Sequence, residues 1–87
     1  MGSFEVIFKR SVAKDLRQIP KKDIARILKR IEDLRAEPRP NGVEKLSGQE
    51  KYRIRQGVYR ILYEIRNAEL IVVVVKIGHR RDVYKIS

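Results

Sequence analysis

The residues best suited to chemistry are three arginines set at matching positions of one short segment. In YRIRQGVYRILYEI, residues 52–65, isoleucine and tyrosine recur at every second position, and Arg53, Arg55 and Arg60 keep to the same alternation. Alternate side chains of a strand point to the same face. Guanidinium groups keep their charge and donate paired hydrogen bonds to phosphate oxygens. The spacing therefore fits either a phosphodiester-binding surface or a solvated strand face.

A hairpin would bring these arginines together. We expect a two-residue turn at Gln56-Gly57, with Gly57 supplying the positive φ that such turns need. Arg55 would then pair with Val58 and Arg53 with Arg60. Like charges directly opposite one another destabilise a sheet, so a bound anion would explain the pairing. The other face of the hairpin is assigned to the core and carries Tyr52, Ile54, Tyr59, Ile61, Tyr63 and Ile65.

Further candidate groups follow the apolar segment LIVVVV near the C-terminus. The tail after Gly78 carries His79, Arg80, Arg81 and Tyr84, which could reach the arginines. His79 is the one side chain whose ordinary pKa, about 6.5, suits proton transfer near neutral pH. Such a histidine is more often a polar residue that closes a strand than a catalyst, and Tyr84 could instead cap the core. Only one of Arg80 and Arg81 need point inward, and Arg80 is favoured.

The charge of the whole chain supports an anionic partner. Lysine and arginine number 21 against 11 acidic residues, for a formal net charge of +10. Residues 1–41 carry 11 basic and 6 acidic groups and residues 42–87 carry 10 and 5, so each half contributes +5. A globule that is basic throughout favours nucleic acid as partner, with an acidic protein second. Lys45 and Lys51 are candidate non-specific RNA contacts, although a solvated face explains them equally well.

Composition also narrows the class of protein. The 87 residues predict a single domain spanning 1–87. There is no cysteine and only one histidine, which removes disulfides and the usual thiolate or histidine-rich metal sites, so neither metal nor cofactor is expected. No apolar run suits a signal peptide or a membrane span, and we expect a cytoplasmic protein with no membrane partner.

The elements that must position the arginines follow from periodicity. An α+β fold of order β-α-α-β-β-β is predicted, with an antiparallel sheet and both N-terminal helices packed on one face. Residues 45–50 are expected to form a loop, the apolar last strand to be central, and Gly78 to end it. The strands are expected at 4–10, 51–55, 58–65 and 69–77, and the helices at 11–19 and from Pro20 to 34.

The order of these motifs resembles the RelE branch of the RelE/ParE superfamily of bacterial and archaeal toxins. The resemblance rests on F-x-x-S-x-x-K-D-L-x-x-I-P at 8–20, on YRIRQGVYRILYEI, and on GHRRDVY after the apolar strand. It covers nearly the whole chain. It implies a fold like that of microbial ribonucleases and a toxin that cleaves mRNA in the ribosomal A site without a metal. Attack by the 2′-hydroxyl would leave a 2′,3′-cyclic phosphate, and a cognate antitoxin would block the toxin.

The resemblance also implies roles for single residues. Arg60 matches the arginine that holds the scissile phosphate, Arg80 a basic residue that stabilises the transition state or protonates the leaving oxygen, and Tyr84 the tyrosine that orients the nucleotide. Arg53 and Arg55 stand where better-known members have lysine. Because arginine has a pKa above about 12, it is a poor proton acceptor. The remaining candidates for proton transfer are His79, Tyr84 and a glutamate such as Glu50.

The rival function comes from the ParE branch of the same superfamily. Its members share the fold and the C-terminal pattern but inhibit DNA gyrase without nuclease activity. They generally lack a concentrated basic cluster, so Arg53, Arg55, Arg60 and Arg80 favour the ribonuclease. A plain nucleic-acid-binding module is the third possibility, and it would bind RNA without cleaving it.

Overall fold

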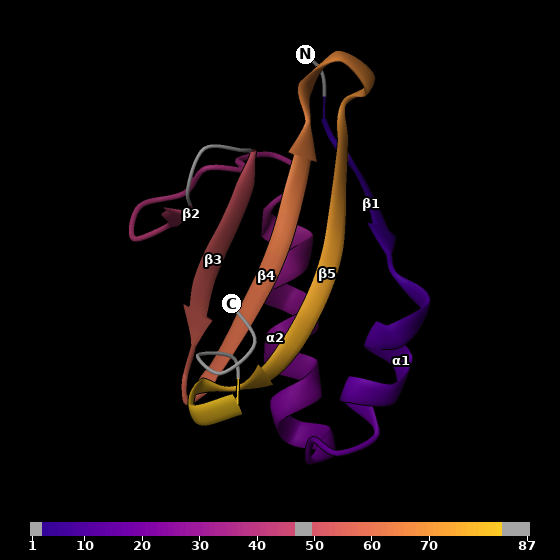
Figure 1. Cartoon of the computed structure of the whole chain (residues 1–87), viewed down its shortest axis with the longest axis vertical. Coiled ribbons are helices and arrows are strands. Elements are labelled where there is room, and N and C mark those ends of the chain that lie inside the picture. The colour runs from indigo at the N-terminus through magenta and orange to yellow at the C-terminus, as the bar shows by residue number, and fades with distance from the viewer. Residues whose placement is uncertain (1–2, 47–49, 83–87) are drawn as a thin grey trace.

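The computed structural model describes residues 3–46 and 50–82, and these form a five-stranded sheet with two α-helices. The strands lie in the order β1-β5-β4-β3-β2. Figure 1 shows α2 behind the sheet and α1 beside it, below the end of β1. The elements are β1 (Glu5–Phe8), α1 (Arg10–Leu16), α2 (Lys21–Asp33), β2 (Glu44–Leu46), β3 (Lys51–Gln56), β4 (Tyr59–Arg66), the 3-10 helix η1 (Asn67–Glu69) and β5 (Ile71–His79).

The predicted α+β class is confirmed, but the prediction of a wholly antiparallel sheet is wrong. β1 pairs with β5 in parallel, from Glu5 opposite Ile71 to Phe8 opposite Val74, while the other neighbours are antiparallel. Parallel neighbours need a long crossover. Here both helices and three strands separate β1 from β5 in the chain, so the last strand can return alongside the first.

β2 lies at the edge of the sheet and was not predicted. Residues 44–46, partly inside the expected loop, pair with β3, with Glu44 opposite Arg53 and Leu46 opposite Lys51. Three residues are too few to show an alternating pattern. A very short edge strand also offers little template for pairing with another chain.

The hairpin of β3 and β4 forms with a register two residues away from the predicted one. The turn residues are Gly57 and Val58, so Arg55 opposes Arg60, and Arg53 opposes Leu62 rather than Arg60. Gly57 has a φ of 60°, as predicted, but it occupies the first central position, which type II′ turns give to glycine. Because side chains alternate with period two, a shift of two residues leaves every side chain on its predicted face.

The core lies between the sheet and the helices. Tyr52 and Tyr63 stack there with ring centroids 5.7 Å apart, and the buried Tyr63 hydroxyl donates to the carbonyl of Pro38 at 2.6 Å. Burial raises the pKa of the Tyr63 phenol. The predicted core of the hairpin is confirmed, with Tyr59 partly buried at its margin. The helices contribute Val12, Ile27, Ile31 and Leu34, and β5 contributes Val72, Val74 and Ile77.

β5 is interior to the sheet, between β1 and β4, as its apolar sequence indicates. Val73, on the face away from the helices, is only 6% exposed. The prediction that Gly78 ends the strand is wrong, since β5 continues to His79 and Gly78 pairs with Arg60. A glycine inside a strand often marks a close approach by another group, and here that cross-strand neighbour is an arginine.

Helix α1 protects the part of β5 that extends beyond β1. The Asp15 carboxylate accepts hydrogen bonds from Lys76 Nζ at 2.8 Å and from the Ile77 backbone N–H at 3.1 Å. It thus satisfies a backbone donor that β1 does not reach. Across residues 3–46 and 50–82, no helix has the length and apolarity needed to span a membrane.

Candidate functional site on the arginine face of the sheet

Arg53, Arg55 and Arg60 lie together on the sheet face turned away from the helices, which we call the arginine face. Arg55 and Arg60 are directly opposite each other beside the Gly57 turn, and Arg53 lies two residues before Arg55 on β3. Figure 1 shows the turn between β3 and β4 at the lower end of the sheet, beside the end of β5. The gathering predicted from alternation is therefore confirmed, although the directly opposed pair is a different one.

Arg60 is the most enclosed of the three. Its residue is only 6% exposed, and Nη1 donates to the carbonyls of Gly57 at 3.2 Å and Tyr59 at 3.0 Å. Its buried Nε has no hydrogen-bond partner among the described residues. A buried charge is costly unless it is paired. Arg60 is thus fixed by nearby backbone carbonyls while its Nε donor is unused, so it is suited to bind an external anion.

Glu44 is a member of this cluster that the sequence did not reveal. Arg53 Nη2 donates to Glu44 Oε2 at 3.0 Å across the β2–β3 pair. The hydrogen bond from Arg53 and its charge, followed by the charges of Arg55 and Arg60, lower the pKa of the Glu44 carboxyl. The carboxylate is thus ionised at neutral pH, and the charges of all three arginines stabilise that form. Only knowledge that residues 44–46 pair with residues 51–53 could have placed Glu44 in this cluster.

A backbone hydrogen bond holds the residues after β5 beside the turn end of the hairpin. The Arg80 N–H donates to the Val58 carbonyl at 2.8 Å, which fixes the chain beside the turn, and the backbone is helical from 80 to 82. The side chains of Arg80 and Arg81 are exposed. Tyr84 lies outside the described residues.

His79 does not join the arginines. It pairs with Tyr59 across β4 and β5 and contacts that ring edge-on, with centroids 6.1 Å apart, so it lies on the helix-facing side. There it lines a cavity of about 180 Å³ with Asp15, Gln18 and Tyr59 among others. Its Nδ1 accepts a hydrogen bond from the Arg81 N–H at 3.2 Å. The expectation that His79 reaches the arginine face is wrong, because its strand position gives it the opposite orientation.

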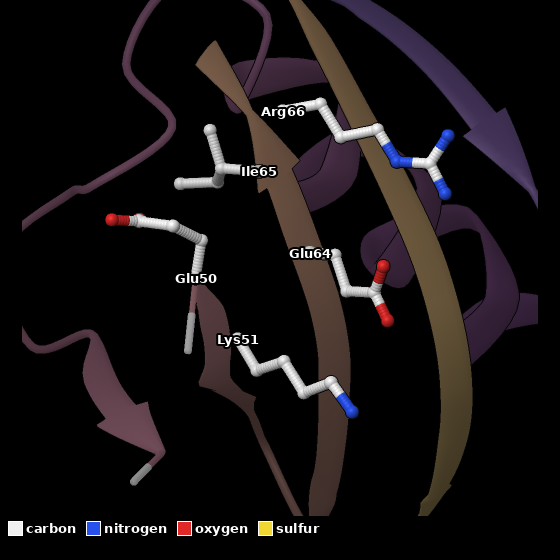
Figure 2. A pocket seen from close by; sticks show the side chains of 5 residues that line it. All are labelled: Glu50, Lys51, Glu64, Ile65 and Arg66. Atoms are coloured by element: carbon white, nitrogen blue, oxygen red, sulfur yellow. The ribbon is translucent and has the colours of Figure 1, made fainter. Parts of the chain in front are cut away.

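The two candidate lysines are separated by the sheet. Lys51 pairs with Glu64, on the arginine face, whereas Lys45 pairs with Tyr52, on the other side. In Figure 2 Lys51, Glu64 and Arg66 extend to one side of a shallow hollow and Glu50 extends to the other. The Lys45 ammonium is 3.8 Å from a Glu50 carboxylate oxygen.

Glu50, a candidate for proton transfer, belongs to a different network. Its carboxylate accepts hydrogen bonds from the Tyr52 hydroxyl and, at 2.9 Å, from Arg39 Nη2, and these two contacts lower its pKa. Arg39 also donates from Nε to the Tyr52 hydroxyl at 3.0 Å and from Nη2 to Asn67 at 3.1 Å. This cluster lies at the far end of the hairpin from Arg60. Within the described ranges, histidine and acidic side chains form no group of three that could hold a metal ion.

Comparisons with known proteins agree with this geometry. Residues 6–84 match the family model described as the ParE toxin of the type II toxin–antitoxin system parDE. The chain is 30% identical over 86 residues to the putative toxin RelE1 of Methanocaldococcus jannaschii, covering 94% of this chain and 96% of that protein. It is also 30% identical to toxin RelG of Mycobacterium tuberculosis, covering 94% and 97%. The archaeal RelE–RelB complex of Pyrococcus horikoshii superposes with a TM-score of 0.81 at 30% identity, covering 90% of this chain and 96% of that one.

The fold, the basic strand face and these matches define a toxin of a toxin–antitoxin system. The chain belongs to the RelE/ParE superfamily of such toxins. Its named relatives and the matching solved complex are of the Rel type, so the RelE branch is favoured over a ParE-like gyrase inhibitor.

Proposed function

We propose that this protein is a ribosome-dependent endoribonuclease that cleaves mRNA in the A site and thereby inhibits translation. The observation that carries the proposal is Arg60, a nearly buried guanidinium with an unpartnered Nε on a face that holds two further arginines. Cations fixed in advance around the position of developing negative charge lower the barrier to phosphoryl transfer. Arg60 supplies the main contact to the scissile phosphate, and Arg53 and Arg55 position it.

The reaction needs no group beyond the RNA, the protein and water. The 2′-oxygen of the nucleotide attacks the adjacent phosphorus, the bond from phosphorus to the 5′-oxygen breaks, and a 2′,3′-cyclic phosphate forms. One proton leaves the 2′-hydroxyl and one proton joins the departing 5′-oxygen. Arg60 and Arg80 stabilise the extra negative charge of the pentacoordinate phosphorus, and solvent protonates the 5′-oxygen.

Glu44 is the group we assign to accept the 2′-hydroxyl proton. Its carboxylate is ionised, lies on the arginine face and is held by Arg53. Glu50 is engaged by Tyr52 and Arg39 at the other end of the hairpin, and His79 faces the helices. Lys51 and Arg81 serve as RNA contacts, and Lys45 contacts RNA from the other side of the sheet. Tyr84 keeps the nucleotide-orienting role that the family resemblance implies.

The proposed partners are the ribosome with its mRNA and a cognate antitoxin. The antitoxin is supported by the solved RelE–RelB complex that this chain resembles over 90% of its length. We propose the cytoplasm as its location, because translation takes place there.

The test is to add the purified protein to ribosomes that are translating a defined mRNA and to map new 5′ ends by primer extension. We expect cuts at fixed positions within A-site codons, and we expect them to disappear with Arg60→Ala. Arg66→Ala is a matched control, because Arg66 is an exposed arginine at the other end of β4. Intact mRNA combined with gyrase-linked DNA breaks would move the protein to the ParE function. RNA binding without any cleavage would mean that the protein is a nucleic-acid-binding module and not an enzyme.

A further inference from the structure

His79 lies where β5 ends and the short helical segment that carries Arg80 and Arg81 begins. It is the last residue of β5, and the backbone is helical from 80 to 82. The residue directly before the first helical position is the N-cap, and its side chain can accept a hydrogen bond from the backbone N–H two or three residues further on. The Nδ1 atom of His79 accepts such a bond from the Arg81 N–H at 3.2 Å. His79 therefore has the geometry of an N-cap residue.

The cap completes the hydrogen bonding at the start of this helical segment. The first N–H groups of a helix have no partner inside the helix. Here the Arg80 N–H donates to the Val58 carbonyl at 2.8 Å, and the Arg81 N–H donates to His79. The first bond ties the segment to the turn between β3 and β4, which lies beside the end of β5 (Figure 1), and the second ties it to β5 itself. Together they fix the backbone from which the exposed Arg80 side chain extends.

The imidazole is held in place from the neighbouring strand. His79 pairs with Tyr59 across β4 and β5, and the two rings meet edge-on at an interplanar angle of 80°. This contact restricts rotation of the imidazole, so the direction in which Nδ1 points is set before any RNA arrives. A preset cap costs no ordering when the substrate binds.

A charged imidazole cannot form this cap. Both ring nitrogens then carry a hydrogen and neither can accept one, and a cation is also unfavourable at a helix N-terminus. Histidine is the side chain that ordinarily changes charge between about pH 5 and 8, whereas arginine stays charged there. The groups that face the ring are the Asp15 carboxylate of α1, the Lys76 ammonium that Asp15 binds, the Asp82 carboxylate, and the Tyr59 phenol, on which Asp23 of α2 acts.

We infer that His79 is a positioning residue for mRNA cleavage, because its neutral imidazole caps the segment that carries Arg80 and keeps that segment beside the turn end of the arginine face. This inference rests on the proposed function, in which Arg80 stabilises the charge of the pentacoordinate phosphorus. His79 itself touches no RNA and transfers no proton. Its effect on the reaction passes through the backbone of Arg80 and Arg81.

The experiment measures single-turnover cleavage at saturating ribosomes from about pH 5.5 to about pH 8, with all proteins compared at the same pH so that effects on the ribosome cancel. His79→Leu removes the acceptor and should lower the rate at neutral pH by about 3-fold to 30-fold, the range for loss of an N-cap on a short helix. His79→Asn supplies an acceptor that does not titrate. It should stay within about twofold of wild type at neutral pH and should exceed wild type at the acid end.

Gln18→Leu is the matched control, because it removes another polar side chain from the same cavity and leaves the cap intact. It should follow wild type at each pH. A wild-type rate in His79→Leu would overturn the inference. So would an asparagine variant as slow as the leucine variant, because the imidazole would then act by proton transfer. If His79→Leu lowers the urea midpoint, the comparison of wild type with His79→Asn across pH still decides.

The ¹⁵N chemical shifts of the imidazole give a readout that does not depend on cleavage. His79 is the only histidine of the chain, so its ring signals need no further assignment. A neutral ring with its hydrogen on Nε2 supports the cap, and a hydrogen on Nδ1 would overturn it. A wild-type protein that shows the Nε2–H form but cuts no mRNA would refute the proposed function and leave the cap standing.

Discussion

Arginine and carboxylate side chains lie close together at both ends of the β3–β4 hairpin, but the balance of charge differs between the two ends. At the end away from the turn, Arg39 is matched by the Glu50 carboxylate, the Tyr52 hydroxyl and the Asn67 amide oxygen, and its guanidinium lies 5.3 Å from the centre of the Tyr52 ring. At the turn end, Arg53 binds the Glu44 carboxylate, and the charges of Arg55 and Arg60 also act on that carboxylate. The first cluster is balanced, and the second carries excess positive charge.

The difference distinguishes a structural cluster from a binding site. The Arg39 network ties the segment before β2 to β3 and to η1, and each of its members contributes to that connection. Among the described residues, the hydrogen bonds of Arg60 go to the carbonyls of Gly57 in the turn and of Tyr59 next to it, and its buried Nε has no partner there. Unmatched buried donors in native proteins call for an explanation, and a phosphate that arrives with the substrate provides one.

The largest effect is expected from Arg60→Met, which tests whether Arg60 serves the reaction or the fold. We expect mRNA cleavage on ribosomes to fall by at least about 10²-fold, as for loss of a preorganised charge-stabilising group. Stability should stay the same or rise, because burying an unpaired guanidinium is costly and methionine places an apolar chain of similar length there. Urea unfolding and primer extension measure the two effects. A large loss of stability would show that Arg60 is structural, like Arg39.

The next largest effect is expected from Glu44→Gln. If Glu44 accepts the 2′-hydroxyl proton, cleavage falls by about 10²-fold, within the usual range for a general base. Binding of the substrate should stay the same or strengthen, because a competing negative charge is gone. Glu50→Gln is the matched control and should keep the wild-type rate. Single-turnover cleavage at saturating ribosomes gives the rate, and unchanged cleavage in Glu44→Gln would exclude it as the base.

The sequence predicted the faces of this hairpin better than its pairing. Alternation alone placed Tyr52, Ile54 and Tyr63 in the core and the arginines opposite them. The exact register depends on which two residues form the turn, and QGV allows glycine at either central position. The two choices differ by two residues, so they keep the same faces but change which arginine meets which.

The remaining differences come from contacts between distant segments. Glu44 enters the arginine face through β2, a strand too short to leave a pattern, and β1 becomes parallel to β5 through a crossover that local periodicity does not record. Gly78 and His79 looked like the end of a strand because glycine commonly ends regular structure. In the fold Gly78 sits opposite Arg60, and the strand continues one residue further, which turns His79 toward the helices.

A smaller effect on the structural side is expected from Tyr63→Phe. Its buried hydroxyl donates to the Pro38 carbonyl at 2.6 Å and holds the segment after α2 against the core. Losing it leaves a buried acceptor unsatisfied, which costs about 1–3 kcal/mol. We expect a lower urea midpoint with an unchanged cleavage rate, since Tyr63 lies on the face away from the arginines. A loss of cleavage that exceeded the loss of folded protein would contradict this separation of the two faces.

The smallest expected effect is the pH dependence of the balanced cluster. Hydrogen bonds from Tyr52 and Arg39 lower the pKa of Glu50 in the folded state. A carboxyl with a lowered folded pKa contributes stability above its unfolded pKa, about 4.5, and loses it as the pH falls through the folded value. Glu50→Gln should therefore be less stable than wild type at pH 7, and the gap should narrow below about pH 4.5. Because Glu50 is exposed, salt should also reduce the gap. Urea midpoints at pH 7 and pH 3, in low and high salt, measure it. A gap that is constant with pH would mean that the Arg39 network holds Glu50 by geometry rather than by charge, and the contrast with the arginine face would then rest on Arg60 alone.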